Sequence, residues 1–242
     1  MATSETSFAD RHQRGQAMHD AIDGFAPAFN PQDPNLAAGA FQSYLNGVEA
    51  TNDAVSEAEA VLTPLTDERT AAAEALKDKA LRVKDHVGAN VAWKKHLKAI
   101  SAAADNVRGY SLPKKVVPPP AGSPPPVPKK ARQGARSQQS FADLEKLFGK
   151  LLAQVKKVTG YAATVGSGLM ITELTAQDDA FTLLNDNVSE AEETLSEAQR
   201  IRKDFYDGEN GLREKMKSIK KAVRAQYGSA STQYAAVVGI AL

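Results

Sequence analysis

The chain has 242 residues, with 30 Lys and Arg against 29 Asp and Glu, and it contains no cysteine. The aromatic share of 6% and the abundance of alanine favour long helices in one large domain or two small ones. The lack of cysteine excludes disulfides, cysteine-ligated zinc and thiol catalysis, and no apolar run reaches the roughly 18 residues that a membrane span needs. The polar first residues contain no secretory signal core, so we expect a cytoplasmic protein.

The first half of the chain reads as a series of helices. Small or apolar residues three and four apart predict a helix over 11–25, and helix breakers predict a loop over 27–35. A long helix follows, and two interpretations of it stay open: it breaks at Pro64 or near Lys77. A short helix over 91–107 closes this half. The expected buried stripe of the preceding helix is Leu76, Ala80, Val83 and Val87.

A proline-rich basic segment separates the two halves. Eight of the twelve prolines lie within 113–128, which predicts an extended spacer without regular backbone hydrogen bonds. Seven basic residues and no acid lie between Asp105 and Asp143, so the remainder of a chain of net charge +1 carries −6. The segment is either a solubilising spacer or a contact for polyanions. Its candidate contact residues are Lys114, Lys115, Lys129, Lys130, Arg132 and Arg136.

The second half repeats the helical pattern. A helix is expected over 144–158, then a loop over 160–168, then a long helix that ends at Asp207 and Gly208. A third helix ends at Gly228, and an apolar tail follows it. The expected buried stripe of that third helix is Leu212, Met216, Ile219 and Val223.

The two halves also contain identical short sequences at a constant offset. The sequence SFAD at 7–10 recurs at 140–143, and VSEAE at 55–59 recurs at 188–192, each at an offset of 133. Further on the offset becomes 140, which places seven extra residues in the second copy. We therefore expect an all-α protein of two tandem antiparallel bundles, with about three long helices each. The expected domains are 1–110, a Pro/Lys-rich linker over 111–136, and 137–242.

The ending of the second copy carries a resemblance. VRAQYGSAS at 223–231, followed by Tyr234 and the pair Gly239–Ile240, is similar to a set of uncharacterised, internally duplicated helical proteins of bacteria. Ser140–Phe141 and the sequence NDNV at 185–188 match as well. The resemblance implies the duplicated helical fold, and no activity is established for the family.

Motifs for catalysis or metal binding are absent from the sequence. The four histidines (His12, His19, His86 and His96) form neither Glu-x-x-His nor His-Glu-x-x-His, so we expect them to be solvated. The carboxylate pairs at 53/57 and 186/190 lie four residues apart, as on a solvated helix face. Gly166–Ser167–Gly168 lacks the residues of a phosphate loop. We expect no enzymatic activity, no cofactor and no metal.

Two functions are consistent with these features. The first is a structural or protein-interaction module that binds copies of itself, as a homo-oligomer, or another protein through helical faces. The alternative is a nucleic-acid or polyanion binder, which would use the linker and a basic face of the third helix of the second half. The basic residues of that face are Arg213, Lys217, Lys220, Lys221 and Arg224.

Overall fold

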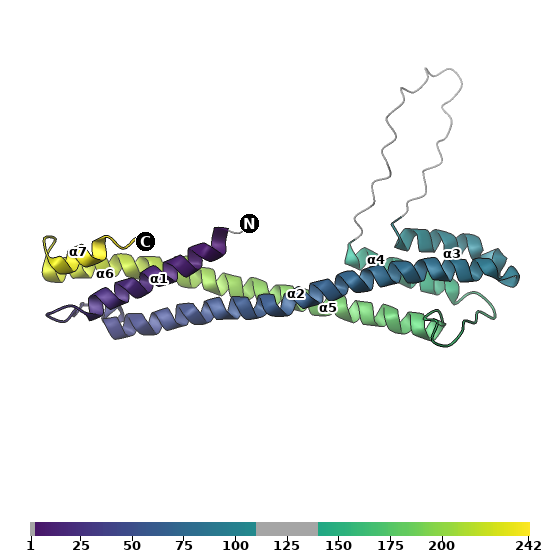
Figure 1. Ribbon diagram of the computed structural model, residues 1–242, viewed down its shortest axis with the longest axis horizontal. Helices are drawn as coiled ribbons and strands as arrows, with labels where there is room; N and C mark the ends of the chain where they lie inside the picture. The colour runs from purple at the N-terminus through teal and green to yellow at the C-terminus, as the bar shows by residue number, and fades with distance from the viewer. Residues whose placement is uncertain (1–2, 110–139) are drawn as a thin grey trace, which may run out of the picture. The chain divides into compact units, whose positions relative to one another are not determined.

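The structure is a computed structural model that describes residues 3–109 and 140–242, and every regular element in these ranges is a helix (Figure 1). The all-α prediction is therefore confirmed. In chain order the elements are α1 (Thr3–Asp23), the 3-10 helix η1 (Pro34–Leu36), α2 (Ala38–Ala89), the 3-10 helix η2 (Val91–Trp93), α3 (Lys94–Val107), α4 (Phe141–Val155), α5 (Ile171–Asp207), α6 (Leu212–Tyr227) and α7 (Thr232–Val238).

The chain forms two compact units that differ from the predicted domains. Unit 1 contains Met1–Thr63 and Glu190–Leu242, and unit 2 contains Pro64–Ser189, so the divisions fall inside α2 and α5. Each unit therefore combines helices of both halves of the sequence. The physical reason is the length of α2: its 52 residues expose far more apolar surface than the short helices of its own half can cover.

Unit 1 is built around one apolar core. Helices α1, α6 and α7 pack on one another (Figure 1), and Val237 of α7 is fully buried. Met18 of α1 and Leu45 of α2 share the core with Met216 of α6, and none of these three side chains is more than 2% exposed. The N-terminal part of α2 thus buries its apolar face against helices from the second half of the sequence.

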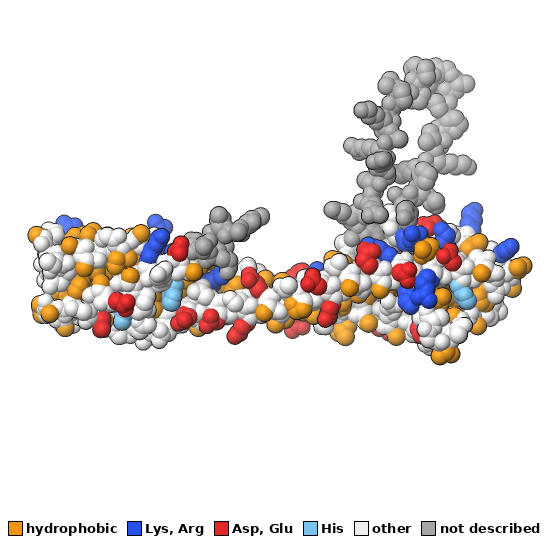
Figure 2. Space-filling model, in the orientation of Figure 1, with side chains coloured by type: hydrophobic (Ala, Val, Ile, Leu, Met, Phe, Trp, Pro, Cys, Tyr) orange, Lys and Arg blue, Asp and Glu red, His pale blue; other side chains and the backbone are white. Residues whose placement is uncertain are grey.

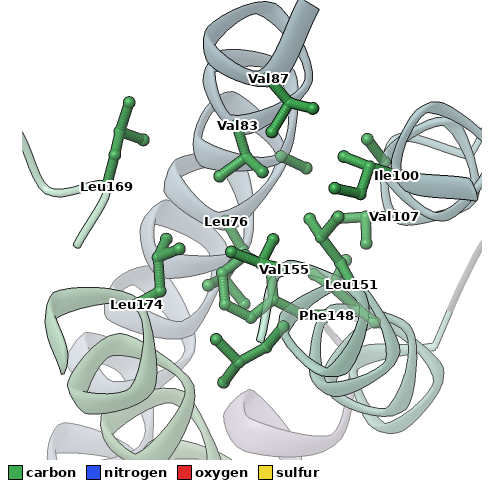
Figure 3. Packing of buried hydrophobic residues seen from close by; sticks show 14 of the residues in the cluster. Leu76, Val83, Val87, Ile100, Val107, Phe148, Leu151, Val155, Leu169 and Leu174 are labelled. Carbon is green, nitrogen blue, oxygen red and sulfur yellow. The ribbon is translucent and has the colours of Figure 1, made fainter. Parts of the chain in front are cut away.

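Unit 2 has a separate core, in which α3 packs along α4. Figure 3 shows Val83 of α2, Ile100 of α3 and Leu151 of α4 directed towards a common centre, together with Leu174 of α5. The C-terminal part of α2 is therefore covered by α4, which again comes from the other half of the sequence.

The predicted stripes are confirmed in both units. Leu76, Ala80, Val83 and Val87 are fully buried, and Leu212, Met216, Ile219 and Val223 are at most 2% exposed. The alternatives for the long helix of the first half are both wrong, because α2 continues through Pro64 and Lys77. Proline removes one backbone donor, but Pro64 is exposed and alanine-rich turns on both sides maintain the helix.

Two arginine–phenylalanine contacts occupy matching positions in the two units. In unit 1 the Arg202 guanidinium lies 4.5 Å from the centre of the Phe8 ring, and in unit 2 that of Arg69 lies 4.3 Å from the centre of the Phe141 ring. The two arginines are 133 positions apart, and so are the two phenylalanines. Each arginine packs on the phenylalanine of the other half of the sequence.

Candidate functional site

The predicted basic face belongs to α6, whose buried stripe fixes the orientation of the helix. With that stripe turned inward, the five basic residues fall within an arc of about 100° on another side of the helix. The arc begins close to the stripe at Lys220, so the five side chains do not share one environment. Their contacts decide which of them could meet a partner.

Two of the five basic residues are engaged within the protein. The Lys220 ammonium donates to the carbonyl oxygens of Val238 at 3.1 Å and Ile240 at 2.5 Å, and its burial lowers the pKa of the amine. The Lys217 ammonium lies 2.6 Å from a carboxylate oxygen of Glu214. The predicted five-residue face is thus too large. The same Lys220 contacts hold the apolar tail on its own unit.

The remaining three basic residues, Arg213, Lys221 and Arg224, are exposed. They lie within about 80° of one another around the helix. Glu214 is close to this group, and the pKa of its carboxyl is lowered, first by the hydrogen bond from Lys217 and then by nearby charges that include Lys221. The face is therefore positive, with one acid at its edge. The other predicted contacts (Lys114, Lys115, Lys129, Lys130, Arg132 and Arg136) lie outside the described residues.

An apolar groove in unit 1 was not predicted from the sequence. It has a volume of about 500 Å³ and lies between the parts of α2 and α5 that belong to this unit. Small residues line the α2 side and larger ones the α5 side. The residues that define it best are Gly47, Ala50, Ala54, Ala198, Ile201 and Phe205. The spacing of three and four between the small residues of α2 was the available signal.

Acidic side chains lie beside this groove. On α5, Glu197 lines the groove itself and Glu193 lies one turn before it; on α2, Glu57 follows Ala54 by one turn. These three acids are exposed, and Figure 2 shows acidic side chains along α2 on the visible face. No Lys or Arg occurs in the sequence from residue 15 to 68. This charge gap in the sequence could have indicated the acidic surface.

Hydrogen bonds and ring contacts fix the wall of the groove at Phe205. The Tyr44 hydroxyl donates to the Phe205 carbonyl oxygen at 2.5 Å, and the two rings stack with their centres 5.7 Å apart. The next residue, Tyr206, is fully buried, and its hydroxyl accepts a hydrogen bond from the Asn52 amide at 3.0 Å. Arg11 then binds the Asp207 carboxylate at 2.6 Å. The end of α5 is therefore held from both α1 and α2.

The remaining titratable candidates do not form a site. The paired carboxylates Asp53, Glu57, Asp186 and Glu190 are all exposed, as expected for a solvated face. All four histidines are partly buried, contrary to expectation, because each lies on a packed helix or beside a loop. The His86 ring lies 5.4 Å from that of Trp93 and donates to the Ala162 carbonyl oxygen at 2.9 Å. Within the described ranges no group of three or more His, Asp or Glu residues could hold a metal ion.

A comparison with known protein families, with curated proteins and with solved structures found no match. The helices in residues 3–109 and 140–242 are too short or too polar to cross a membrane. The groove of unit 1 and the exposed cations of α6 are thus the two surfaces from which a function can be argued.

Proposed function

We propose that the protein is a non-enzymatic scaffold that associates with copies of itself through exposed faces of its long helices. The groove of unit 1 carries this proposal, because it leaves Ile201 of α5 38% exposed among apolar neighbours. Burial of such a surface by a partner releases water and favours association.

A duplicated architecture supports the same proposal. We propose that residues 1–110 and 137–242 are repeats of one ancestral unit, joined by the linker over 111–136. The matched Phe8–Arg202 and Phe141–Arg69 contacts, which connect opposite halves of the sequence, support the duplication. Repeats present similar surfaces twice, which suits a protein that bridges several partners.

Light scattering behind a sizing column, over a range of protein concentrations, tests self-association. We expect a mass above the 25.8 kDa of a single chain. Ile201→Gln should raise the concentration needed for association about tenfold, because it replaces an apolar contact by a polar one. Val165→Gln is the control, since Val165 is 82% exposed in a loop of unit 2. A mass of one chain at every concentration would contradict the proposal.

Polyanion binding is the second candidate, and the exposed cations of α6 support it. Arg213, Lys221 and Arg224 form a positive cluster that is exposed, whereas Lys220 is engaged by the tail. If the chain is monomeric, a heparin titration at two salt concentrations tests this candidate. Binding through these cations would weaken steeply as salt rises, because each neutralised anion releases a counterion.

A further inference from the structure

We propose that the groove of unit 1 binds the proline-rich basic segment 113–130 of a second copy of this chain. The inference rests on the proposed self-association and names the two surfaces that meet. The groove provides an apolar floor between acidic side chains, and the segment provides proline and valine between two pairs of lysines.

Charge complementarity is the first argument. Segment 113–130 contains four lysines and no acid. Glu57 lies on the α2 side of the groove, and Glu193 and Glu197 lie on the α5 side, all of them exposed. Arg200 neutralises part of this charge, since its guanidinium binds Glu197 at 2.6 Å. Glu57 and Glu193 belong to stretches free of basic residues, so they keep their charge available for a partner.

The shape and polarity of the groove provide the second argument. Gly47, Ala50 and Ala54 leave a shallow shelf on α2, and Ile201 and Phe205 form an apolar wall opposite. Proline-rich segments bind well to apolar surfaces with aromatic rings because their backbone is already extended and loses little entropy. Proline rings can lie on the shelf while the lysine pair at one end of the segment reaches the acidic side chains.

We assign the segment to a second copy because this follows from the proposed self-association, and the placement of the segment in the chain allows it. The segment connects α3 to α4, and both of these helices belong to unit 2. The groove belongs to unit 1. A second copy can therefore supply the segment without any requirement on the placement of the two units within one chain. Binding in this way links one chain to the next and gives a self-associating scaffold.

Fluorescence anisotropy of a labelled synthetic peptide of residues 113–130, titrated with the full chain, tests the contact directly. We expect binding that weakens at high salt. The double variant Glu57→Lys with Glu193→Lys should reduce the affinity at least about tenfold, because like charges then face the lysines. The matched control is Asp67→Lys with Asp85→Lys, which reverses two exposed acids of unit 2 and should leave the affinity unchanged.

A charge exchange between two full-length variants guards against a folding artefact. One variant carries glutamate in place of Lys114, Lys115, Lys129 and Lys130; the other carries the Glu57→Lys and Glu193→Lys changes. By light scattering each variant alone should be shifted towards the mass of a single chain. Their mixture should associate again, because the reversed segment of one chain then matches the reversed groove of the other.

The outcomes separate this inference from the function on which it rests. Loss of association in each variant with recovery in the mixture supports it. Unchanged association of both variants, or equal peptide affinity for the groove variant and its control, overturns the inference and leaves self-association standing. A wild-type chain that is monomeric at every concentration overturns self-association itself.

Discussion

A half-buried carboxylate lies in unit 2 at a position where the first half of the sequence has an apolar residue. Among the residues that the structure describes, one buried carboxylate oxygen of Asp178 has no hydrogen-bond partner, and the position 133 residues earlier is the fully buried Leu45. Burial raises the pKa of Asp178, and the nearby charges of Asp179 and Glu145 raise it further. The ionised form is therefore less stable in the folded than in the unfolded chain.

Asp178→Asn should stabilise unit 2 at pH 7 by about 1 kcal/mol, a modest gain because the side chain is only partly buried. Because the folded-state pKa of Asp178 is raised, the destabilisation of the wild-type protein disappears as pH falls through that pKa to the usual aspartate value of 3.8. The wild-type protein and the Asn variant should therefore become equally stable in acid. Urea unfolding followed by Trp93 fluorescence, at pH 7 and pH 4, measures the difference. Asp85→Asn, at an exposed site, is the control. A constant difference at both pH values would disprove the electrostatic cause.

The buried stripe of α6 determines the stability of unit 1. Ile219 is fully buried in its core, so Ile219→Ala removes apolar contacts and leaves a cavity. The loss should be about 2–5 kcal/mol. Lys221→Ala, two residues further on an exposed face, should change stability by no more than about 0.5 kcal/mol. Urea denaturation followed by circular dichroism compares the two variants, and equal effects would mean that the packing of α6 is misassigned.

Helix positions could be predicted from the sequence, but helix continuity could not. The stripes of α2 and α6 were readable because apolar spacing follows the helical period. The passage of α2 through Pro64 depends on an exposed ring and strong helix formers on both sides. At the end of α5 the constraint is local: a side chain at Gly208 would collide with the carbonyl oxygen of Asp204, four residues earlier, although Gly208 is not in the left-handed conformation. Single-sequence periodicity contains none of this information.

The candidate surfaces, too, could be predicted from the sequence only in part. Basic residues on one side of α6 could be found by counting around a helix, yet the engagement of Lys220 by the tail depends on how residues 238–240 fold back. The groove of unit 1 brings together positions near 50 and near 200; the spacing of small residues on α2 indicates one side of the groove, but nothing local indicates which helix forms the other side. The separation of positive from negative charge along the sequence was the one long-range indication of a binding surface.

At the scale of the whole molecule, the two compact units make each half of the sequence dependent on the other. In unit 1, α1 packs with α6 and α7, and in unit 2, α3 packs with α4, so both cores combine helices from the first and second halves. A half expressed alone would leave the stripe of its longest helix exposed to water. Most of the stability of the folded state should therefore be gained only when the two halves associate.

We expect fragments 1–110 and 137–242, produced separately, to form a one-to-one complex with a cooperative thermal transition. Each fragment alone should melt without cooperativity or form homodimers of lower stability, because positions 133 residues apart, such as the buried Leu45 and the half-buried Asp178, differ between the halves. Co-purification through a tag on one fragment, light scattering and melting by circular dichroism measure this outcome. Phe8→Ala in the first fragment should weaken the complex, since the Arg202 guanidinium in the second packs on that ring at 4.5 Å. If both fragments fold cooperatively as monomers and do not bind each other, each half is an independent bundle, as the sequence-based division into 1–110 and 137–242 predicts.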